Sequence, residues 1–222
     1  MNTALHDRKI EVLAGIIRER ARAPIRRLLV VGCGSGKEAA ILARELGADV
    51  FGIDLDDAFD SAATTVAQLR RGDATCLEFG DETFDFVFSF HVLEHIPDYT
   101  RALAEMRRVL SKDGAYCVGT PNRLRLVAYL GTEVTWREKL AWNIADWKAR
   151  LCGRFRNEFG AHAGFSSGEL KAALEKVFRL NEEITPSYYL SVYRNHAALV
   201  SLLGKLRLDR LLFPAVYFMG RK

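Results

Sequence analysis

Strand-like and helix-like stretches alternate through the first half of the chain, and this alternation restricts the possible folds more than any other feature. The apolar runs of strand length are residues 26–31, 48–54, 81–90 and 114–121. Amphipathic stretches of helix length stand between them at 37–47 and 98–110. Strands that alternate with helices in this way form a parallel sheet with helices on both faces. The sequence therefore predicts an α/β fold.

Further elements are predicted on both sides of this core. Residues 4–22 have the spacing of an amphipathic helix. The stretch 165–178 has the composition of a capped helix, with Ser166 or Ser167 at the N-cap and Glu169 close to the capping-box position. The other expected elements are one or two helical turns within 55–65, strands at 66–70 and 180–186, a helix at 195–211 and an edge strand formed by the closing AVYFMGRK.

The size and composition of the chain favour a single domain. With 222 residues, of which 49% are hydrophobic, the chain can bury a substantial core. We expect one domain over residues 1–222. Its expected parts are an N-terminal helix 4–22, a core 26–122, a cap insertion 123–160 and a C-terminal part 161–222 that contains the inserted helix 195–211.

Several features of the sequence predict a cytoplasmic protein. No stretch reaches the roughly 18 uncharged apolar residues that a membrane span needs. The N-terminus carries charges throughout and lacks the apolar centre of a secretory signal. The four cysteines are widely separated and contain no CxxC pair, which argues against a zinc ribbon and a disulfide framework. The net charge of +4 is too small to indicate nucleic-acid or membrane binding by itself.

A glycine-rich loop, VVGCGSGKE, joins the first predicted strand to the helix after it. In such a loop, backbone N–H groups and the helix N-terminus approach a ligand closely. A phosphate-binding P-loop is excluded, because Gly36-Lys37 is followed by Glu38 instead of Ser or Thr. The dinucleotide motif GxGxxG fits only in part, because Lys37 occupies the position of its third glycine. A nicotinamide-dependent oxidoreductase stays open as an alternative at this point.

The loop has the pattern GxGxG, and several further motifs follow it along the chain. Asp54 ends the second predicted strand, and GDATCLEFGDETFDFVFS contains Asp73 and Ala74. FHVLEHIPD and EMRRVLSKDGAYCVGTPN follow in that order. In these features residues 26–122 resemble the class I S-adenosylmethionine-dependent methyltransferases of the type 11 group. The resemblance implies a Rossmann-like, seven-stranded, mostly parallel sheet with helices on both faces and a helical cap.

The resemblance also implies which residues bind the cofactor, S-adenosyl-L-methionine. Asp54 matches the acidic residue that binds the ribose hydroxyls, and Asp73 matches the residue that meets the adenine amino group. Phe90 and His91 would line the methionine half. The full set of expected cofactor-binding residues is Gly32, Cys33, Gly34, Gly36, Asp54, Leu55, Asp73, Ala74, Phe90 and His91.

The segment HVLEH lies where this family holds the transferred methyl group. It matches the HxxEH pattern of some zinc proteases, but it follows a strand and ends at Pro97, whereas those proteases need it on a helix. Ubiquinone-pathway O-methyltransferases have a related Glu-x-x-Glu-His segment that is associated with a divalent metal. His91 replaces the first Glu here, so we predict no metal. Glu94 and His95 either take part in the chemistry or orient the loop, and the sequence leaves both open.

Transfer to a hydroxyl requires a base, and histidine accepts a proton near neutral pH. The candidate bases are His91, His95 and His162. His162, and Asn122 at the end of the strand 114–121, are also expected to contact the substrate. The predicted reaction is O-methylation of a small-molecule or lipid-linked acceptor. The alternative from another class is a cofactor-binding protein without turnover that serves assembly.

Two segments added to the sheet are expected to select the acceptor, because such additions vary while the sheet is shared. One is the Trp- and Arg-rich stretch 123–156, and the other is the helix 195–211. They are expected to cover an apolar acceptor, to rest peripherally on a membrane surface, or to pack on the body of the protein. The basic residues come with no RNA-binding motif. The sequence leaves the oligomeric state open.

Overall fold

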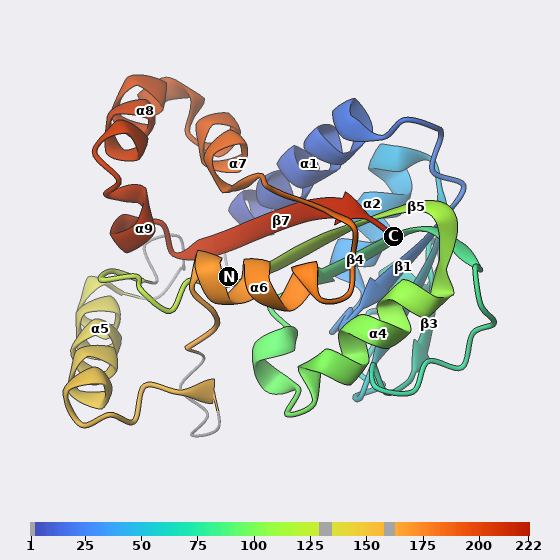
Figure 1. Ribbon diagram of the computed structural model, residues 1–222, viewed down its shortest axis with the longest axis horizontal. Helices are drawn as coiled ribbons and strands as arrows, with labels where there is room; N and C mark the ends of the chain where they lie inside the picture. The colour runs from blue at the N-terminus through green and yellow to red at the C-terminus, as the bar shows by residue number, and fades with distance from the viewer. Residues whose placement is uncertain (1–2, 129–134, 158–162) are drawn as a thin grey trace.

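A seven-stranded sheet runs through the centre of the protein in the computed structural model, which describes residues 3–128, 135–157 and 163–222 (Figure 1). The strands are β1 (Arg27–Val31), β2 (Asp49–Asp54), β3 (Gln68–Arg71), β4 (Phe84–Phe90), β5 (Leu110–Pro121), β6 (Leu180–Glu183) and β7 (Ala215–Arg221). Their order is β3-β2-β1-β4-β5-β7-β6. The first five pair in parallel, and β7 is antiparallel to both of its neighbours. The predicted α/β class with a mostly parallel sheet is confirmed.

Helices cover both faces of this sheet and make two separate hydrophobic cores. One core lies under α1 (Thr3–Arg20), α2 (Lys37–Leu46) and α7 (Thr185–Val192). The other lies under α4 (Tyr99–Val109) and α6 (Ser167–Glu175). The central parallel strands β1 and β4 are buried on both faces, which explains why RLLVV and FDFVFSF are nearly continuous apolar runs.

Further helices form a cap at one end of the molecule (Figure 1). They are α5 (Trp136–Leu151), the short helix η3 (Arg194–His196), α8 (Ala197–Lys205) and α9 (Asp209–Leu212). The end of β5 lies beside the start of β7, where Pro121 pairs with Ala215, and α9 comes directly before that start. The cap is therefore attached at the carboxyl end of β5.

Local sequence signals explain where several elements begin and end. Gly36 and Gly47 have left-handed backbone on either side of α2, and the N–H of Gly47 donates to the carbonyl of Ala43. Ser166 is the N-cap of α6 and forms the predicted capping box with Glu169. The single turn α3 (Ser61–Thr64) lies within the segment where one or two turns were predicted.

Two predictions about the C-terminal part are wrong. The last strand is not at an edge, because β7 lies between β5 and β6 and is buried along most of its length. The stretch 195–211 is not one helix but is divided among η3, α8 and α9, with a left-handed residue, Arg207, at the break. The helix α7 was not predicted at all. It begins where Pro186 stands in its first turn, a position that proline favours.

Candidate functional site

The glycine loop after β1 turns sharply because its glycines have left-handed backbone. The φ angle is +73° at Gly32, +51° at Gly34 and +85° at Gly36, values that residues with a side chain rarely adopt. The N–H groups of Gly32 and Cys33 donate to the carbonyl of Ile53 at 2.8 and 2.9 Å. These bonds hold the loop against the end of β2.

The three glycines meet different surroundings. A Cβ atom on Gly32 would overlap the side chain of Val92, and one on Gly36 would overlap Leu69. A Cβ atom on Gly34 would have no protein atom within 4 Å. The protein's own packing therefore requires Gly32 and Gly36, whereas Gly34 faces open space before the start of α2. This is the geometry that lets a ligand approach a backbone closely.

The residues that end β2 lie against this opening. Asp54 accepts a hydrogen bond through Oδ2 from the N–H of Gly34 at 2.7 Å, and through Oδ1 from the N–H of Asp56 at 3.2 Å. Leu55 is 67% exposed beside it. The structure thus brings together the glycine loop, a carboxylate and an apolar side chain at the carboxyl edge of β1 and β2.

Cys33 contributes to this loop through its backbone and not through its thiol. The side chain is buried, and burial, reinforced by the nearby Asp54 carboxylate, raises the pKa of the Cys33 thiol to about 12. The thiol therefore stays protonated at neutral pH and is a poor nucleophile.

Asp73 lies beyond the end of β3, in a turn that fixes its carboxylate. Its Oδ1 accepts hydrogen bonds from the N–H and the hydroxyl of Thr75, both at 2.8 Å. These bonds lower the pKa of Asp73, so the carboxylate is ionised at neutral pH. Ala74 next to it is buried. An ionised carboxylate in this place can accept a hydrogen bond from an amino group.

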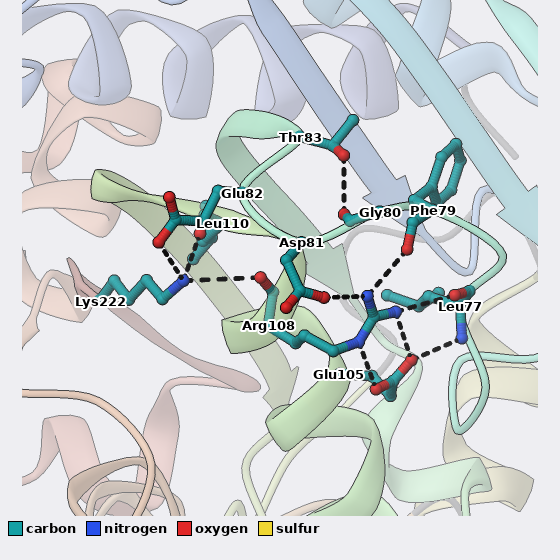
Figure 2. A network of polar contacts seen from close by, with 10 residues as sticks. All are labelled: Leu77, Phe79, Gly80, Asp81, Glu82, Thr83, Glu105, Arg108, Leu110 and Lys222. Atoms are coloured by element: carbon teal, nitrogen blue, oxygen red, sulfur yellow. Dashed lines mark hydrogen bonds and ion pairs between the residues drawn. The ribbon is translucent and has the colours of Figure 1, made fainter.

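A network around Arg108 holds the segment that leads from this turn to β4 (Figure 2). The guanidinium of Arg108 donates to the carbonyls of Leu77 and Phe79 at 2.9 and 2.8 Å. It also donates to Asp81 at 2.7 Å and to both oxygens of Glu105 at 2.8 Å. The N–H of Leu77 donates in turn to Glu105 at 2.8 Å. Helix α4 thereby fixes the loop that follows the Asp73 turn.

Replacing Arg108 by glutamine is expected to lower the free energy of unfolding by about 1–3 kcal/mol, because the substitution breaks several partly buried hydrogen bonds at once. We expect cofactor affinity to fall as well, since the loop after Asp73 loses its support. Urea denaturation and calorimetric titration measure the two effects. Arg107→Gln, one position earlier on α4, is the matched control, and equal stability of the two variants would contradict the prediction.

The segment after β4 places two histidines around one carboxylate. It forms a short 3₁₀ helix, η1 (Leu93–His95), instead of the α-helix that the zinc-protease pattern needs. His91 Nδ1 lies 3.6 Å from Glu94 Oε1, and His95 Nε2 lies 3.9 Å from the same oxygen. The histidine side chains are 43% and 49% exposed, whereas the Glu94 side chain is fully buried.

His91 has an unusual backbone for a residue with a side chain. Its φ angle is +56°, and its N–H donates to the carbonyl of Gly119 on β5 at 2.9 Å. Its ring lies edge-on to Phe90, with ring centroids 4.1 Å apart, and Phe90 stacks on Tyr217. Strained backbone in a non-glycine residue is concentrated at functional sites. Phe90 and His91 are thus fixed at the carboxyl end of β4.

Comparison with known protein families accounts for this arrangement. A family model described as a methyltransferase domain matches residues 29–118, which contain the glycine loop, Asp54, Asp73 and η1. Residues 29–118 therefore match a methyltransferase domain, and relatives of this stretch include S-adenosylmethionine-dependent methyltransferases. The cofactor of this class is S-adenosylmethionine.

Curated relatives match the methyltransferase domain at modest identity. A probable S-adenosylmethionine-dependent methyltransferase from Mycolicibacterium smegmatis is 34% identical over 45% of this chain and 39% of its own length. A ubiquinone biosynthesis O-methyltransferase from Hahella chejuensis is 34% identical over 48% of each chain. The chloroplastic tocopherol O-methyltransferase of Arabidopsis thaliana is 33% identical over 64% of this chain and 41% of its own length. The chain spans less than half the length of these relatives.

A solved structure extends the likeness to nearly the whole chain. The [4+2]-cyclase SpnF is 19% identical, with a TM-score of 0.57, over 96% of this chain and 80% of its own. At this identity the likeness shows the fold alone. It indicates that the C-terminal strands and helices, which lie outside the family match, belong to the same architecture as the methyltransferase domain.

Glu94 has an unusual environment for a carboxyl group. Neither of its carboxylate oxygens has a hydrogen-bond partner among the described residues. Burial raises the pKa of Glu94 to about 7, against smaller opposing effects of its own backbone N–H and of the Arg125 charge. A buried carboxyl without hydrogen bonds costs stability, and such groups are found at functional sites more than elsewhere.

A stability measurement can test this burial. The folded-state pKa of Glu94 lies above its unfolded value of 4.5, so the contribution of the carboxyl to stability is complete below pH 4.5 and is lost as the pH rises through about 7. Relative to Glu94→Gln, the wild-type free energy of unfolding is expected to fall by up to about 3 kcal/mol over that interval. Urea denaturation of both proteins from pH 4.5 to 8 measures it. Parallel pH profiles would show that Glu94 does not titrate in this range.

Asn122 lies at the end of β5, as predicted, but its side chain bonds within the protein. Its amide donates to the carbonyls of Arg210 and Phe213 at 2.8 and 2.9 Å, and its oxygen accepts from the N–H of Leu124 at 3.0 Å. The residue is 2% exposed. Its observed contacts join β5 to α9, and a contact with substrate stays a prediction. His162, the third candidate base, lies outside the described residues.

Arg125 is a functional candidate that sequence reasoning missed. It is 4% exposed and donates to the carbonyls of Asn122 and Ala163 and to Asp146 at 3.1, 3.3 and 3.4 Å. Its charge acts on Glu94. In the sequence it is one of many basic residues in the stretch 123–156, and only its burial distinguishes it.

Over residues 3–128, 135–157 and 163–222, no three His, Cys, Asp or Glu side chains gather as a metal site requires.

Proposed function

We propose that the protein transfers the methyl group of S-adenosylmethionine to a hydroxyl oxygen of an apolar small-molecule or lipid-linked acceptor. The observation that carries this proposal is the buried Glu94 carboxylate between two exposed histidines at the carboxyl end of β4. Val92 of the same segment packs on Gly32, so this group adjoins the glycine loop. Two curated relatives are named O-methyltransferases and are named for ubiquinone and tocopherol.

The residues at the carboxyl edge of the sheet fit the cofactor. The open space at Gly34 admits a ligand, Asp54 and Asp73 offer carboxylates for ribose hydroxyls and the adenine amino group, and Phe90 offers a ring at the methionine end. When bound, the cofactor supplies a methyl group that its sulfonium already activates. The protein then has to hold the acceptor oxygen in line with that methyl and remove the hydroxyl proton.

His95 is proposed as the base that takes this proton. Its Nε2 lies 3.9 Å from Glu94 Oε1, and its side chain is 49% exposed, so an acceptor hydroxyl can approach the ring from solvent. When the proton moves from the hydroxyl to the ring, the imidazole becomes a cation beside the Glu94 carboxylate. The carboxylate would then stabilise the positive charge, and it would orient the ring before the transfer. His91 at 3.6 Å from the same oxygen is the alternative base.

Two experiments test the proposal in sequence. Calorimetric titration with S-adenosylmethionine, S-adenosylhomocysteine and NADH should show binding of the two adenosyl compounds alone. Transfer of a tritiated methyl group should then be found with prenylated phenols and hydroquinones, and not with the corresponding amines. Binding of NADH would favour an oxidoreductase. Adenosyl binding without transfer to any hydroxyl would favour a binding protein that serves assembly.

A further inference from the structure

Helix α5 packs on the protein through its polar side. Asn143 bonds to the backbone of Ala128, and Arg150 donates to the carbonyls of Arg123 and Arg125 at 2.7 and 2.8 Å. The adjoining side of the helix carries an apolar stripe with positions three or four residues apart. These side chains are exposed by 40% to 89%: Trp136, Leu140, Ile144, Trp147 and Leu151. An amphipathic helix normally faces its protein with the apolar side, so this orientation is reversed.

Helix α8 repeats the feature at the other end of the cap. Leu199, Leu202 and Leu206 follow helical spacing and are 55%, 50% and 59% exposed. Only Val200 of this helix is buried. Arg194 and Lys205 lie exposed near the two ends of the helix. The predicted apolar face exists, but these three leucines do not pack on the body of the protein.

The two helices belong to one continuous structure. The indole N–H of Trp147 donates to the carbonyl of Leu126 at 2.7 Å, and the N–H of Leu126 donates to the carbonyl of Leu211 at 2.7 Å. These bonds join α5, through the segment after β5, to the end of α9, and α9 contacts α8. Figure 1 shows all three helices along one end of the molecule. That end is where β5 finishes and where the proposed acceptor site opens.

The charge of the chain is concentrated in the same two segments. Residues 123–156 contain eight Lys or Arg against three Asp or Glu, and residues 194–211 contain four against one. Together these segments carry more net positive charge than the whole chain, whose net charge is +4. The rest of the chain is therefore net negative. Exposed Leu and Trp side chains flanked by Lys and Arg are the composition of helices that lie in the interface of an anionic bilayer.

We propose that α5 and α8 dock the protein onto the surface of an anionic lipid bilayer. Among the residues that the structure describes, no helix is both long and apolar enough to cross a membrane, so the contact is with the surface. Trp136 and Trp147 would lie at headgroup level, where tryptophan is enriched. Docking in this orientation turns the carboxyl ends of β4 and β5 toward the membrane. The proposal is independent of methyl transfer, because it needs neither cofactor nor acceptor.

The test uses the tryptophans as reporters, since all three of them, Trp136, Trp142 and Trp147, lie in α5. We expect the protein to co-sediment with vesicles that contain phosphatidylglycerol. Its tryptophan fluorescence should shift to shorter wavelength on binding, and brominated lipids should quench that fluorescence. Neutral phosphatidylcholine vesicles and high salt should weaken binding about 10-fold or more, because several basic side chains contribute. Absence of quenching or of binding to the anionic vesicles would overturn the proposal.

Charged substitutions on α5 and α8 test whether these helices form the surface that contacts the membrane. Leu199→Glu with Leu202→Glu, and separately Leu140→Glu with Leu151→Glu, are each expected to weaken vesicle binding at least about 10-fold, since they put charge in the interface. Leu180→Glu is the matched control, because Leu180 is as exposed as Leu199 (55%) but lies on β6. Equal loss in the control would overturn the assignment. The assignment would also be overturned if the protein sedimented as a dimer without lipid and the α5 and α8 substitutions dissociated that dimer.

Discussion

A valine in place of Gly34 is expected to abolish binding of S-adenosylmethionine while the protein stays folded. The side chain would project into space where no protein atom lies within 4 Å, so it would clash with a ligand and not with the fold. The φ angle of +51° adds a strain of roughly 1–2 kcal/mol, which a folded domain can tolerate. Calorimetric titration should show at least a 100-fold loss of affinity for S-adenosylmethionine and for S-adenosylhomocysteine.

The chain contains a control for the backbone strain. Gly47 ends α2 with φ +63°, and a Cβ atom there would also meet no atom within 4 Å. Gly47→Val should therefore lower the melting temperature by a similar amount and leave cofactor affinity unchanged. If both variants bind equally well, the space at Gly34 does not hold the cofactor.

The core of the fold was predictable because its signals are local. The apolar runs of β1 and β4, the left-handed Gly47 after α2 and the capping box at Ser166 each depend on a few neighbouring residues. The position of β7 depends instead on pairing between distant strands. AVYFMGRK has the composition of an edge strand and of a central one alike, so the sequence could not place it between β5 and β6.

The cap shows a second limit of sequence reasoning. The spacing of apolar residues tells which side of a helix is apolar, but it does not tell which side packs. In α5 the polar side packs, because Asn143 and Arg150 find backbone partners in the segment after β5. The stripe of Trp136 and Leu151 is left exposed as a result. Only the three-dimensional structure could show this reversal.

The parts of the candidate site that belong to short sequence motifs could be predicted from the sequence. The structure brings the glycine loop and Asp54 into contact, through the bond between Gly34 and Asp54. It also places both histidines of HVLEH beside Glu94. The complete burial of Glu94 and the charge of Arg125 near it were not predictable, because the two residues come from separate segments and meet only through folding.

His95→Ala is expected to reduce the turnover number by about 100-fold or more and to leave affinity for S-adenosylmethionine unchanged, because a base that acts only on the acceptor contributes to the chemical step. The assay is transfer of the labelled methyl group to the best hydroxyl acceptor, over a range of pH. In the variant, the rise in rate that follows deprotonation of the wild-type base should disappear. Loss of rate without a change in this profile would indicate a structural role.

Two further variants distinguish the role of His95 from the roles of other histidines. His196→Ala changes a histidine on η3, outside the segment that follows β4, and should leave turnover as it is. His91→Ala decides between the two imidazoles, since both face the same oxygen of Glu94 at 3.6 and 3.9 Å. If His91→Ala abolishes transfer while His95→Ala retains full rate, the base is His91. The strained backbone of His91 would then serve to aim the imidazole at the acceptor.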